Sequence, residues 1–520
     1  MYKLSDGGQV NGRACTHSHL HSGAARSLYL RQDAYSSREV IILEATVNHT
    51  SDQKKKLVFN PYLPAWEYIP DGEPHVFGDR LYIYGSHDRF GSEDYCPNDY
   101  VCWSAPVTDL AAWRYEGVIY TKDQDPRSRG KLNLYAPDAV LGPDGRYYLF
   151  YSAANTSVIS VAVCDTPAGR YEYYGDVHRP DGQVWGTAAE DWFEFDPAVL
   201  VDDDGRIWLY SGSSQDYNKR FGHPVVGAFV HELAPDMLTT IGEPKIVMPV
   251  RRGNLLRPNF FEGSSIRKYN GRYYFIYAAT NVTGLNYCVS DRPDEDFVYQ
   301  GCLHNSSDIG INGHTLFNSA YPIGNFHGSL VKIGEDYYIF DHRQTNRNFY
   351  TRQGVAERIR MDADGNFAQA ECTSCGLYGD SLPGRGIYPA YIACSLMGRF
   401  RPDFWNLGHG PYITQQGPDR EGCPDSYVTA ITDRCRVGYK YFDLDGTARK
   451  IQIQIRGEAK GVLRVLDGER GACLAEFRLD MNRKDWKVCA RPMKPRTGKT
   501  AIFFSYRGEG SLDLRAFALR

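Results

Sequence analysis

The chain has 520 residues and is close to electrical balance, with 59 Lys and Arg against 63 Asp and Glu. This balance excludes nucleic acid as the main partner, because phosphate binding needs a basic surface. No apolar run is long enough for a transmembrane helix, so no membrane partner is expected. The 38 Tyr, 24 Phe and 51 Gly are an unusual surplus. Aromatic residues favour strands and Gly favours turns, which predicts an all-β protein.

The N-terminal residues 1–56 show no sustained periodicity, and we expect a poorly ordered extension there. They lack the compact apolar core of a secretion signal. The 13 Cys have no framework spacing, and Cys372-Thr-Ser-Cys375 has a metal-like spacing without a second pair or a nearby His cluster. We therefore interpret that pair as structural or incidental, and we expect reduced thiols in a cytoplasmic protein.

One pattern recurs five times between residues 57 and 384. Each copy has an acidic residue or His, a short apolar strand, a turn with Gly or acidic residues, and an aromatic strand. The turns are hairpin signals such as Asp-Gly and Asn-Gly. Repeats of about 60 residues with several short strands are typical of propeller blades, so we predict a five-bladed β-propeller. The leading residues, at intervals of 58 to 67 positions, are Asp71, Asp138, Asp196, Glu262 and His327.

The pattern changes from residue 385 to residue 520. Short alternating strands with Gly turns recur there, as in Lys450–Arg456, Val462–Leu466 and Thr500–Tyr506. Strands of this kind predict a second, smaller domain with a β-sandwich fold.

The five leading residues are expected to converge, because the first strand of each blade lines the channel of a propeller. Several carboxyl groups in one cavity push their pKa values apart, which creates acid and base roles. Hydrolysis of a glycosidic bond needs such a pair, one protonated acid and one carboxylate. Carboxylates on different blades suit the wider separation of an inverting enzyme, about 6.5–9.5 Å. The alternative is a polar channel lining that holds water or a metal.

Five segments carry a resemblance to a known family: Asn60-Pro-Tyr-Leu-Pro64, Tyr135-Ala-Pro-Asp138, Phe195-Asp-Pro-Ala198, Phe261-Glu-Gly-Ser264 and Phe326-His-Gly-Ser329. Over about Asn60–Asn366 the chain resembles glycoside hydrolase family 43, five-bladed propellers that act on arabinofuranosides and xylosides. Carried over by position, the resemblance implies that Asp71 is the general base, Glu262 the general acid and Asp196 the residue that modulates the pKa of the acid.

The base position departs from the family pattern, which commonly has Asp-Pro where this chain has Asp71-Gly72. Glu73 would share a strand face with Asp71 and is the rival base, although we favour Asp71. Asp138 is expected to bind substrate or to line the channel. Arg352 resembles an Arg that reaches the sugar in the family, with an ion pair on an outer strand as the alternative.

His327 matches an axial His of the family, which implies a direct or water-mediated ligand of a structural calcium ion. A hydrogen-bonded channel His without metal is the alternative, and no cofactor is implied for the chemistry itself. Sugar rings pack on aromatic platforms, and several aromatic residues lie near the blade starts. The candidates are Trp66, Phe90, Trp185, Trp192 and Phe260, while most other aromatic residues are expected in the packing between blades.

The function we expect is an inverting, exo-acting glycosidase. It would release terminal α-L-arabinofuranosyl or β-D-xylosyl units from plant-derived oligosaccharides, as in hemicellulose degradation. The C-terminal domain resembles the carbohydrate-binding-type module often fused to this family, with a purely structural role as the alternative. Other functions left open are a propeller glycosidase for a fructoside or galactoside, a non-catalytic carbohydrate-binding propeller and a metal-dependent lyase. No oligomeric state is predicted.

Overall fold

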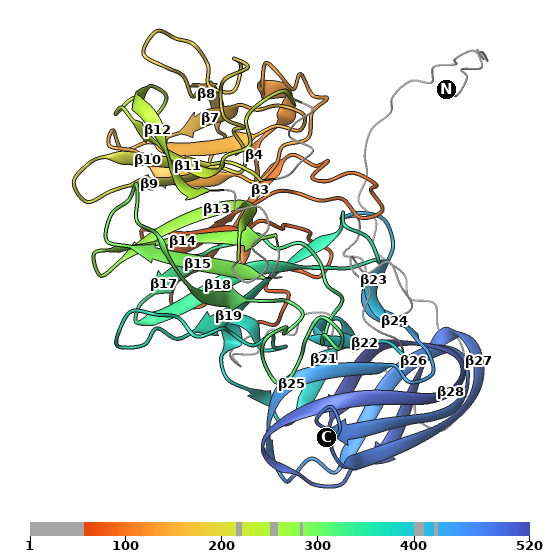
Figure 1. Cartoon of the computed structure of the whole chain (residues 1–520). Coiled ribbons are helices and arrows are strands. Elements are labelled where there is room, and N and C mark those ends of the chain that lie inside the picture. The colour runs from red at the N-terminus through yellow and green to blue at the C-terminus, as the bar shows by residue number, and fades with distance from the viewer. Residues whose placement is uncertain (1–56, 215–220, 250–257, 281–283, 400–409, 421–424) are drawn as a thin grey trace, which may run out of the picture. The chain divides into compact units, whose positions relative to one another are not determined.

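The structure is a computed structural model that describes residues 57–214, 221–249, 258–280, 284–399, 410–420 and 425–520. The expected N-terminal extension lies outside the described residues. The described chain is all-β, as predicted, with five propeller blades followed by a further β region (Figure 1). None of the described helices has the length and apolar character needed to cross a membrane.

The first three blades are four-stranded antiparallel sheets whose strands are neighbours in chain order. A short helix, η1 (Lys122–Gln124), follows blade 1. The strands are β1 (Glu73–Phe77), β2 (Arg80–Tyr84), β3 (Tyr100–Pro106) and β4 (Arg114–Tyr120) in blade 1; β5 (Asp138–Leu141), β6 (Tyr147–Ser152), β7 (Ile159–Cys164) and β8 (Glu172–Asp176) in blade 2; and β9 (Ala198–Val201), β10 (Ile207–Ser211), β11 (Gly227–Leu233) and β12 (Thr240–Pro249) in blade 3.

The last two blades continue this order, and the fifth has three strands among the described residues. Blade 4 consists of β13 (Phe260–Tyr269), β14 (Arg272–Ala279), β15 (Leu285–Ser290) and β16 (Val298–His304). Blade 5 consists of β17 (Leu330–Ile333), β18 (Asp336–Gln344) and β19 (Arg352–Ile359). The five-bladed propeller predicted from the repeat is therefore confirmed.

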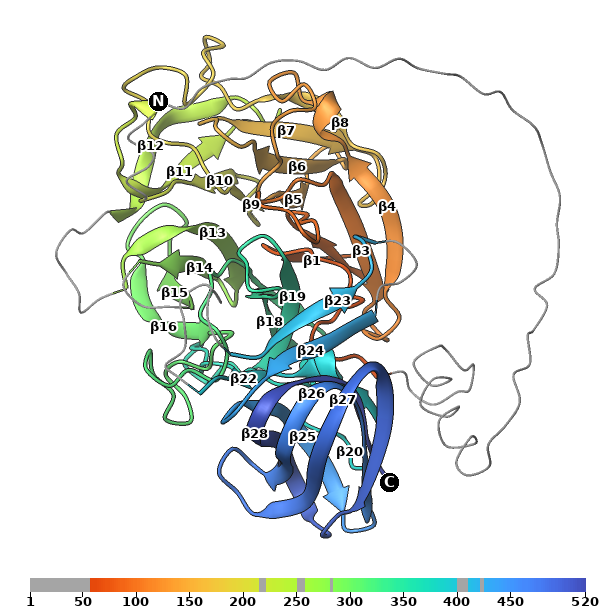
Figure 2. The ribbon, with the colours of Figure 1, turned by 90° about the vertical axis from the view of Figure 1, so that its right-hand side faces the viewer.

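The first strands of the blades surround a common axis. Strand β1 contacts both β17 and β5, β5 contacts β9, and β9 contacts β13. The contact of β1 with β17 closes the ring, and β13 and β17 meet where Ser265 Oγ donates to Ser329 Oγ at 2.7 Å and Arg267 Nε donates to the carbonyl oxygen of Leu330 at 2.9 Å. In Figure 2 the strands β1, β5, β9 and β13 lie toward the middle, and β4, β8 and β12 lie outward.

The blades are held together by an apolar cluster at each of the five junctions. Strand alternation sends successive side chains to opposite neighbours. In β6, for example, Tyr148 and Phe150 pack toward blade 3, whereas Leu149 and Tyr151 pack toward blade 1. The aromatic surplus is thus mainly packing between blades, as expected from the sequence.

The junction between blades 5 and 1 also includes the segment before β1. The side chain of Asn60 pairs with the backbone of Ala356 in β19, accepting from its N–H at 2.9 Å and donating to its carbonyl oxygen at 3.1 Å. Asn60 Nδ2 also lies 2.7 Å from Glu357 Oε1 and 3.1 Å from the carbonyl oxygen of Thr373. One fully buried amide thereby joins the start of the propeller to its end.

The C-terminal region forms one nine-stranded hydrogen-bonded sheet that curls around its own core. The expected sandwich is thus a continuous network, because the long strands β26, β27 and β28 pair along most of their length. Two short helices, η3 (Gly376–Tyr378) and η4 (Ala390–Ile392), lie near its start. The strands are β20 (Leu382–Pro383), β21 (Gly386–Pro389), β22 (Ser395–Met397), β23 (Tyr412–Gln416), β24 (Asp425–Ile431), β25 (Arg436–Asp445), β26 (Lys450–Asp467), β27 (Cys473–Pro492) and β28 (Thr497–Leu519).

The closure of the ring can be tested with Asn60→Ala. The variant leaves the buried backbone groups of Ala356 without their partner, which costs about 2–4 kcal/mol. We expect a lower Tm in calorimetry. The control is Asn318→Ala, because the hydrogen bonds of Asn318 lie at the surface, and its loss is expected below about 1 kcal/mol. Equal effects of the two substitutions would contradict this role of Asn60.

Candidate active site

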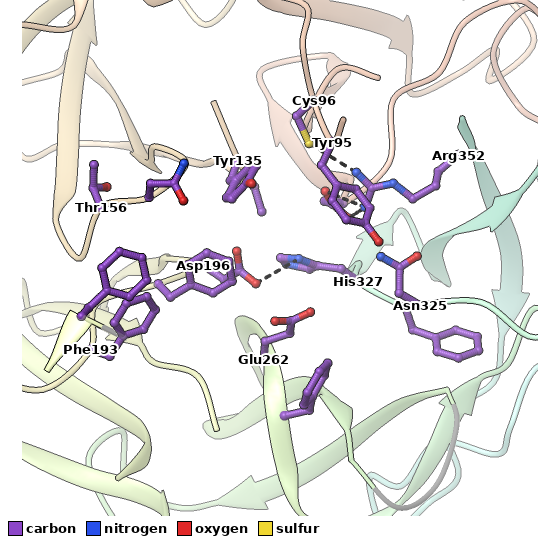
Figure 3. Close-up of a pocket in the computed structure, with 17 residues that line it drawn as sticks. Tyr95, Cys96, Tyr135, Thr156, Phe193, Asp196, Glu262, Asn325, His327 and Arg352 are labelled. Atoms are coloured by element: carbon purple, nitrogen blue, oxygen red, sulfur yellow. Dashed lines mark hydrogen bonds and ion pairs between the residues drawn. The ribbon is translucent and has the colours of Figure 1, made fainter. Parts of the chain in front are cut away.

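A pocket of about 560 Å³ opens at the end of the channel where the blades begin. Four of the five leading residues line it, and Figure 3 shows the carboxylates of Asp196 and Glu262 directed toward its middle. The residues that line it are Asp71, Tyr95, Cys96, Tyr135, Ala136, Asn155, Thr156, Phe193, Phe195, Asp196, Phe221, Phe261, Glu262, Asn325, Phe326, His327 and Arg352.

The three acidic residues of the pocket occupy special backbone positions. Asp71 and Asp196 precede β1 and β9 and have positive φ angles of 57° and 46°. Glu262 lies in β13 at a bulge, next to Gly263 with a φ of 74°. Left-handed conformations of non-glycine residues are costly and are concentrated at functional sites. These positions turn the carboxyl groups to the end of the channel, where regular strand alternation would not place them.

Asp71 is held by a buried arginine from the last blade. Arg352 Nη1 donates to Asp71 Oδ1 at 2.9 Å, and Arg352 Nε and Nη2 donate to Asp88 at 2.9 and 3.0 Å. The backbone N–H of Asp71 donates to His342 Nδ1 at 3.3 Å, and burial lowers the pKa of this imidazole to about 4, so it is neutral. Burial alone would raise the pKa of Asp71, but the charge of Arg352 and the smaller effects of its other neighbours together outweigh burial and hold that pKa below its usual range.

Asp196 has the opposite electrostatic environment. Its Oδ2 accepts from the backbone N–H of Gly263 at 3.1 Å and lies 3.8 Å from His327 Nδ1 (Figure 3). Burial, followed by the nearby carboxylates of Glu262 and Asp71, raises the pKa of Asp196 well above its usual range. Two neighbouring carboxyl groups in a buried site favour one shared proton. The pocket therefore combines Asp71, whose pKa is lowered, with Asp196, whose pKa is raised beside Glu262.

Gly263 allows the close approach of His327 to this pair. A Cβ atom at Gly263 would lie 3.2 Å from Cγ of the His327 ring, and the positive φ also disfavours other residues. The Glu-Gly sequence at the start of blade 4 thus has a structural reason, since the glycine admits the imidazole beside Asp196 and Glu262.

Two predicted acidic residues lie deeper in the channel and do not line the pocket. Asp138 is fully buried, and its carboxylate accepts from the backbone of Ala139 and Val199 and lies 2.7 Å from His75 Nε2. Of the two roles expected for Asp138, the placement supports channel lining and not substrate binding. Both carboxylate oxygens of Asp138 already have partners within the protein, so they are not available to bind a sugar.

Glu73, the rival base, is also directed away from the pocket. Its Oε2 pairs with Arg267 Nη2 at 2.6 Å, and burial raises its pKa to about 7 despite this cation. The expectation that Glu73 shares a strand face with Asp71 is wrong, because the positive φ of Asp71 interrupts the alternation before β1 begins.

The proposed aromatic platforms do not line the pocket either. Phe260 is fully buried in the cluster between blades 3 and 4, so its substrate-binding role is corrected to packing. Trp66 is half-buried and packs near Trp103, with the Arg420 guanidinium 5.8 Å from its ring. The three remaining platforms pack elsewhere: Phe90 on Tyr68, Trp185 on His231 and Trp192 on Phe229.

The aromatic residues that do line the pocket were not assigned from the sequence. Phe195, Phe261 and Phe326 each stand one position before a leading residue, so their position in the repeat was the available signal. Phe193 and Phe221 form a second part of the wall, with ring centroids 5.4 Å apart. Asp88 was also missed, because it lies on a loop outside the repeat and is brought to Arg352 only by the folding of the ring.

A hairpin of the C-terminal sheet contacts blade 1 beside the pocket. Tyr68 Oη donates to Gln415 Oε1 at 2.7 Å, and Asp419 accepts from the backbone N–H of Phe90 at 2.9 Å. Arg420 Nη1 pairs with Glu67 Oε1 at 2.9 Å. The C-terminal region therefore contacts a loop of blade 1 that also contributes residues to the pocket wall.

The groups around His327 show whether it could be a calcium ligand. Calcium prefers six to eight oxygen ligands, but among the described residues no group of three carboxylate, imidazole or thiol ligands includes His327. The carboxylate of Asp196 lies 3.8 Å from its Nδ1. The described side chains do not form a calcium cage.

Comparisons with known proteins agree on one family. The profile of Glycosyl hydrolases family 43 matches residues 68–367. A "Xylosidase/arabinosidase" of Thermoclostridium stercorarium is 44% identical over 477 residues, which cover 89% of this chain and 99% of that protein. An "Arabinoxylan arabinofuranohydrolase" of Paenibacillus polymyxa is 24% identical over 496 residues, covering 88% of this chain and 72% of that protein.

Solved structures of this family are also similar to the chain. The GH43_1 enzyme from Xanthomonas citri complexed with xylotriose has a TM-score of 0.48 and 26% identity, and the match covers 58% of this chain and 91% of that one.

The electrostatic role of Arg352 predicts a change in pH dependence. In Arg352→Met the pKa of Asp71 should rise, because the cation that stabilises its charged form is gone. Opposite charges at this range shift a pKa by about 1–3 units, so the acidic limb of kcat/KM for an aryl glycoside should move up in pH by about that amount. The control is Arg358→Met, because this arginine of the same strand pairs at the surface with Asp336. An unchanged acidic limb in Arg352→Met would contradict the assignment.

Proposed function

Because the chain belongs to glycosyl hydrolases family 43, we propose that this glycoside hydrolase is an inverting exo-glycosidase for terminal α-L-arabinofuranosyl or β-D-xylosyl units. Its substrates would be plant-derived oligosaccharides of hemicellulose. The observation that carries the proposal is the pocket itself, where the pKa of Asp71 is lowered while burial and the nearby Glu262 raise the pKa of Asp196. Opposite protonation states of neighbouring carboxyl groups are what acid–base hydrolysis of a glycoside requires.

The proposed mechanism assigns one step to Asp71, one step to Glu262 and a positioning role to Asp196. Asp71, charged and oriented by Arg352, removes a proton from a water molecule as that water attacks the anomeric carbon. Glu262 donates a proton to the glycosidic oxygen as the bond to the leaving sugar breaks. Asp196 is a positioning residue that keeps a proton on the pair through charge repulsion and accepts a hydrogen bond from Gly263, the neighbour of Glu262. Direct attack of a carboxylate on carbon would give retention, so the configuration of the product separates the two mechanisms.

The substrate assignment has two supports. The relative with 44% identity is named for xylosidase and arabinosidase activity. The pocket has the size of a small-ligand site, within the usual range of about 300–1,000 Å³, and it combines a phenylalanine wall with the polar side chains of Asn155, Thr156 and Asn325. A wall of this kind suits the apolar face of a sugar, and polar groups at its edges suit the hydroxyls. Fructosides and galactosides are the alternative substrates for the assay.

A calcium ion beside His327 is a separate proposal. The described side chains would supply the imidazole, and water would have to supply most oxygen ligands, so no catalytic step is assigned to the ion. Elemental analysis of the purified protein tests this directly, with His327→Gln as the variant that should lose the ion.

A cytoplasmic location is also proposed, and the cysteines are its support. The eleven described cysteines are all free, which fits a reducing compartment such as the cytoplasm. Fractionation of the native host, followed by detection of the protein with an antibody, tests this location.

Substitutions of the acid and the base should have different signatures. Glu262→Ala should lower kcat/KM by about 10²–10⁴ on oligosaccharides, whose leaving group needs a proton, and much less on nitrophenyl glycosides. Asp71→Ala should reduce the rate on both classes, because water activation is needed for each. The control is Glu335→Ala, whose side chain is 97% exposed. Full activity of Glu262→Ala on oligosaccharides would refute the mechanism.

The products distinguish inversion and exo action. Proton NMR during hydrolysis of a nitrophenyl β-D-xyloside should show α-xylose first, because inversion reverses the anomeric configuration. Reduced xylo-oligosaccharides should release single xylose units from the non-reducing end. Initial formation of β-xylose would contradict inversion, and internal cleavage to larger fragments would contradict exo action.

A further inference from the structure

A second cluster of metal-binding side chains lies at the junction of blades 4 and 5, outside the pocket. It consists of His304 at the end of β16, Glu357 in β19 and Cys372 in the segment that leads to the C-terminal sheet. One ligand atom from each lies within 4.8 Å of the others. The exposed fractions of the three residues are 1%, 4% and 5%, and none of them lines the pocket.

The distance between two of the ligand atoms fits a shared zinc ion. His304 Nε2 lies 3.5 Å from Cys372 Sγ. Two ligands of a tetrahedral zinc ion lie about 3.6 Å apart, given Zn–S and Zn–N bonds of about 2.3 and 2.0–2.1 Å. A hydrogen bond between the thiol and the imidazole can have the same distance, so the distance alone does not distinguish a zinc site from a hydrogen bond.

The orientation of the imidazole is the second observation. Asp341 Oδ2 lies 2.8 Å from His304 Nδ1, so Nδ1 carries the proton and the lone pair of Nε2 faces Cys372. A carboxylate behind the distal nitrogen is the usual support of a metal-binding histidine, because it selects the tautomer and orients the ring.

The carboxylate of Glu357 is also held in place by hydrogen bonds. Thr373 Oγ1 donates to its Oε2 at 2.8 Å, and Oε1 accepts from Asn60 Nδ2 at 2.7 Å. Among the described residues no Lys or Arg forms an ion pair with Glu357 or Asp341; the nearby Lys440 pairs with Asp308 and Glu371 instead. Burying carboxylates without a cation is costly, and a divalent ion would supply the missing charge.

We propose that His304, Cys372 and Glu357 bind a structural zinc ion. Sulfur and imidazole ligands favour zinc over calcium or magnesium. The carbonyl oxygen of Ser306, 3.5 Å from Cys372 Sγ, is a candidate for the fourth ligand. Binding displaces the thiol proton to solvent and joins the ends of β16 and β19 to the segment that enters the C-terminal sheet. The site stabilises this junction and takes no part in hydrolysis.

Elemental analysis of the full chain tests the proposal. Protein purified without a metal-affinity tag from zinc-supplemented cells should contain about one zinc per chain, and Cys372→Ser should lose most of it. The matched control is Cys394→Ser, because Cys394 is buried nearby but has the carbonyl oxygen of Gly438 as its partner. A zinc-free wild type would overturn the proposal, as would zinc that persists in both Cys372→Ser and Glu357→Gln, since the ion would then lie elsewhere.

A spectroscopic measurement covers the case in which the variants do not fold. After zinc is removed with a chelator, the wild type reconstituted with Co²⁺ should show a thiolate-to-cobalt charge-transfer band in the near ultraviolet. Zinc removal should also lower Tm, with recovery on adding zinc. The kcat/KM of the protein that remains folded should stay the same. Absence of both the cobalt band and the Tm change would refute the site even if the enzyme is fully active.

Discussion

The packing of each blade against the next, through strands that send alternate side chains to opposite neighbours, is the constraint on which the rest of the structure depends. It places the five first strands around one axis and brings their starting residues to one opening. The chemistry follows from this geometry, because carboxyl groups from blades 1, 3 and 4 share a small buried space. Isolated on separate surfaces, the same groups would all be ionised at neutral pH.

The carboxyl groups differ in protonation because their neighbours differ. Asp71 has Arg352 within hydrogen-bond distance, whereas Asp196 has Glu262 nearby and a backbone N–H as its hydrogen-bond donor. Arg352 comes from the last blade and Asp71 precedes the first strand, so the closure of the ring also sets the charge of the proposed base. The ion pair between Arg352 and Asp71 thus links the junction of blades 5 and 1 to the chemistry of the pocket.

The region after the propeller takes part in the same structure. Its hairpin contacts the loops of blade 1 through Gln415, Asp419 and Arg420. The segment that leads to it contributes Cys372 and Thr373 to the junction of blades 4 and 5. These contacts support a structural role for the C-terminal sheet, whether or not it also binds sugar.

The sequence by itself determined the five repeats, the β class and the residues that begin each blade, because a repeating pattern of turns and aromatic strands is a local property of the chain. Only the tertiary structure decided which of those residues reach the pocket. Asp138 and Glu73 resemble Asp71 in type and position, yet they lie deeper in the channel because left-handed residues and a bulge, not strand alternation, direct the pocket carboxylates. The partners Asp88 and His304 could not be recognised either, because each lies far along the chain from the residues it contacts. The closing of the ring brings Asp88 to Arg352, and the packing of blade 4 against blade 5 brings His304 to Asp341 and Cys372.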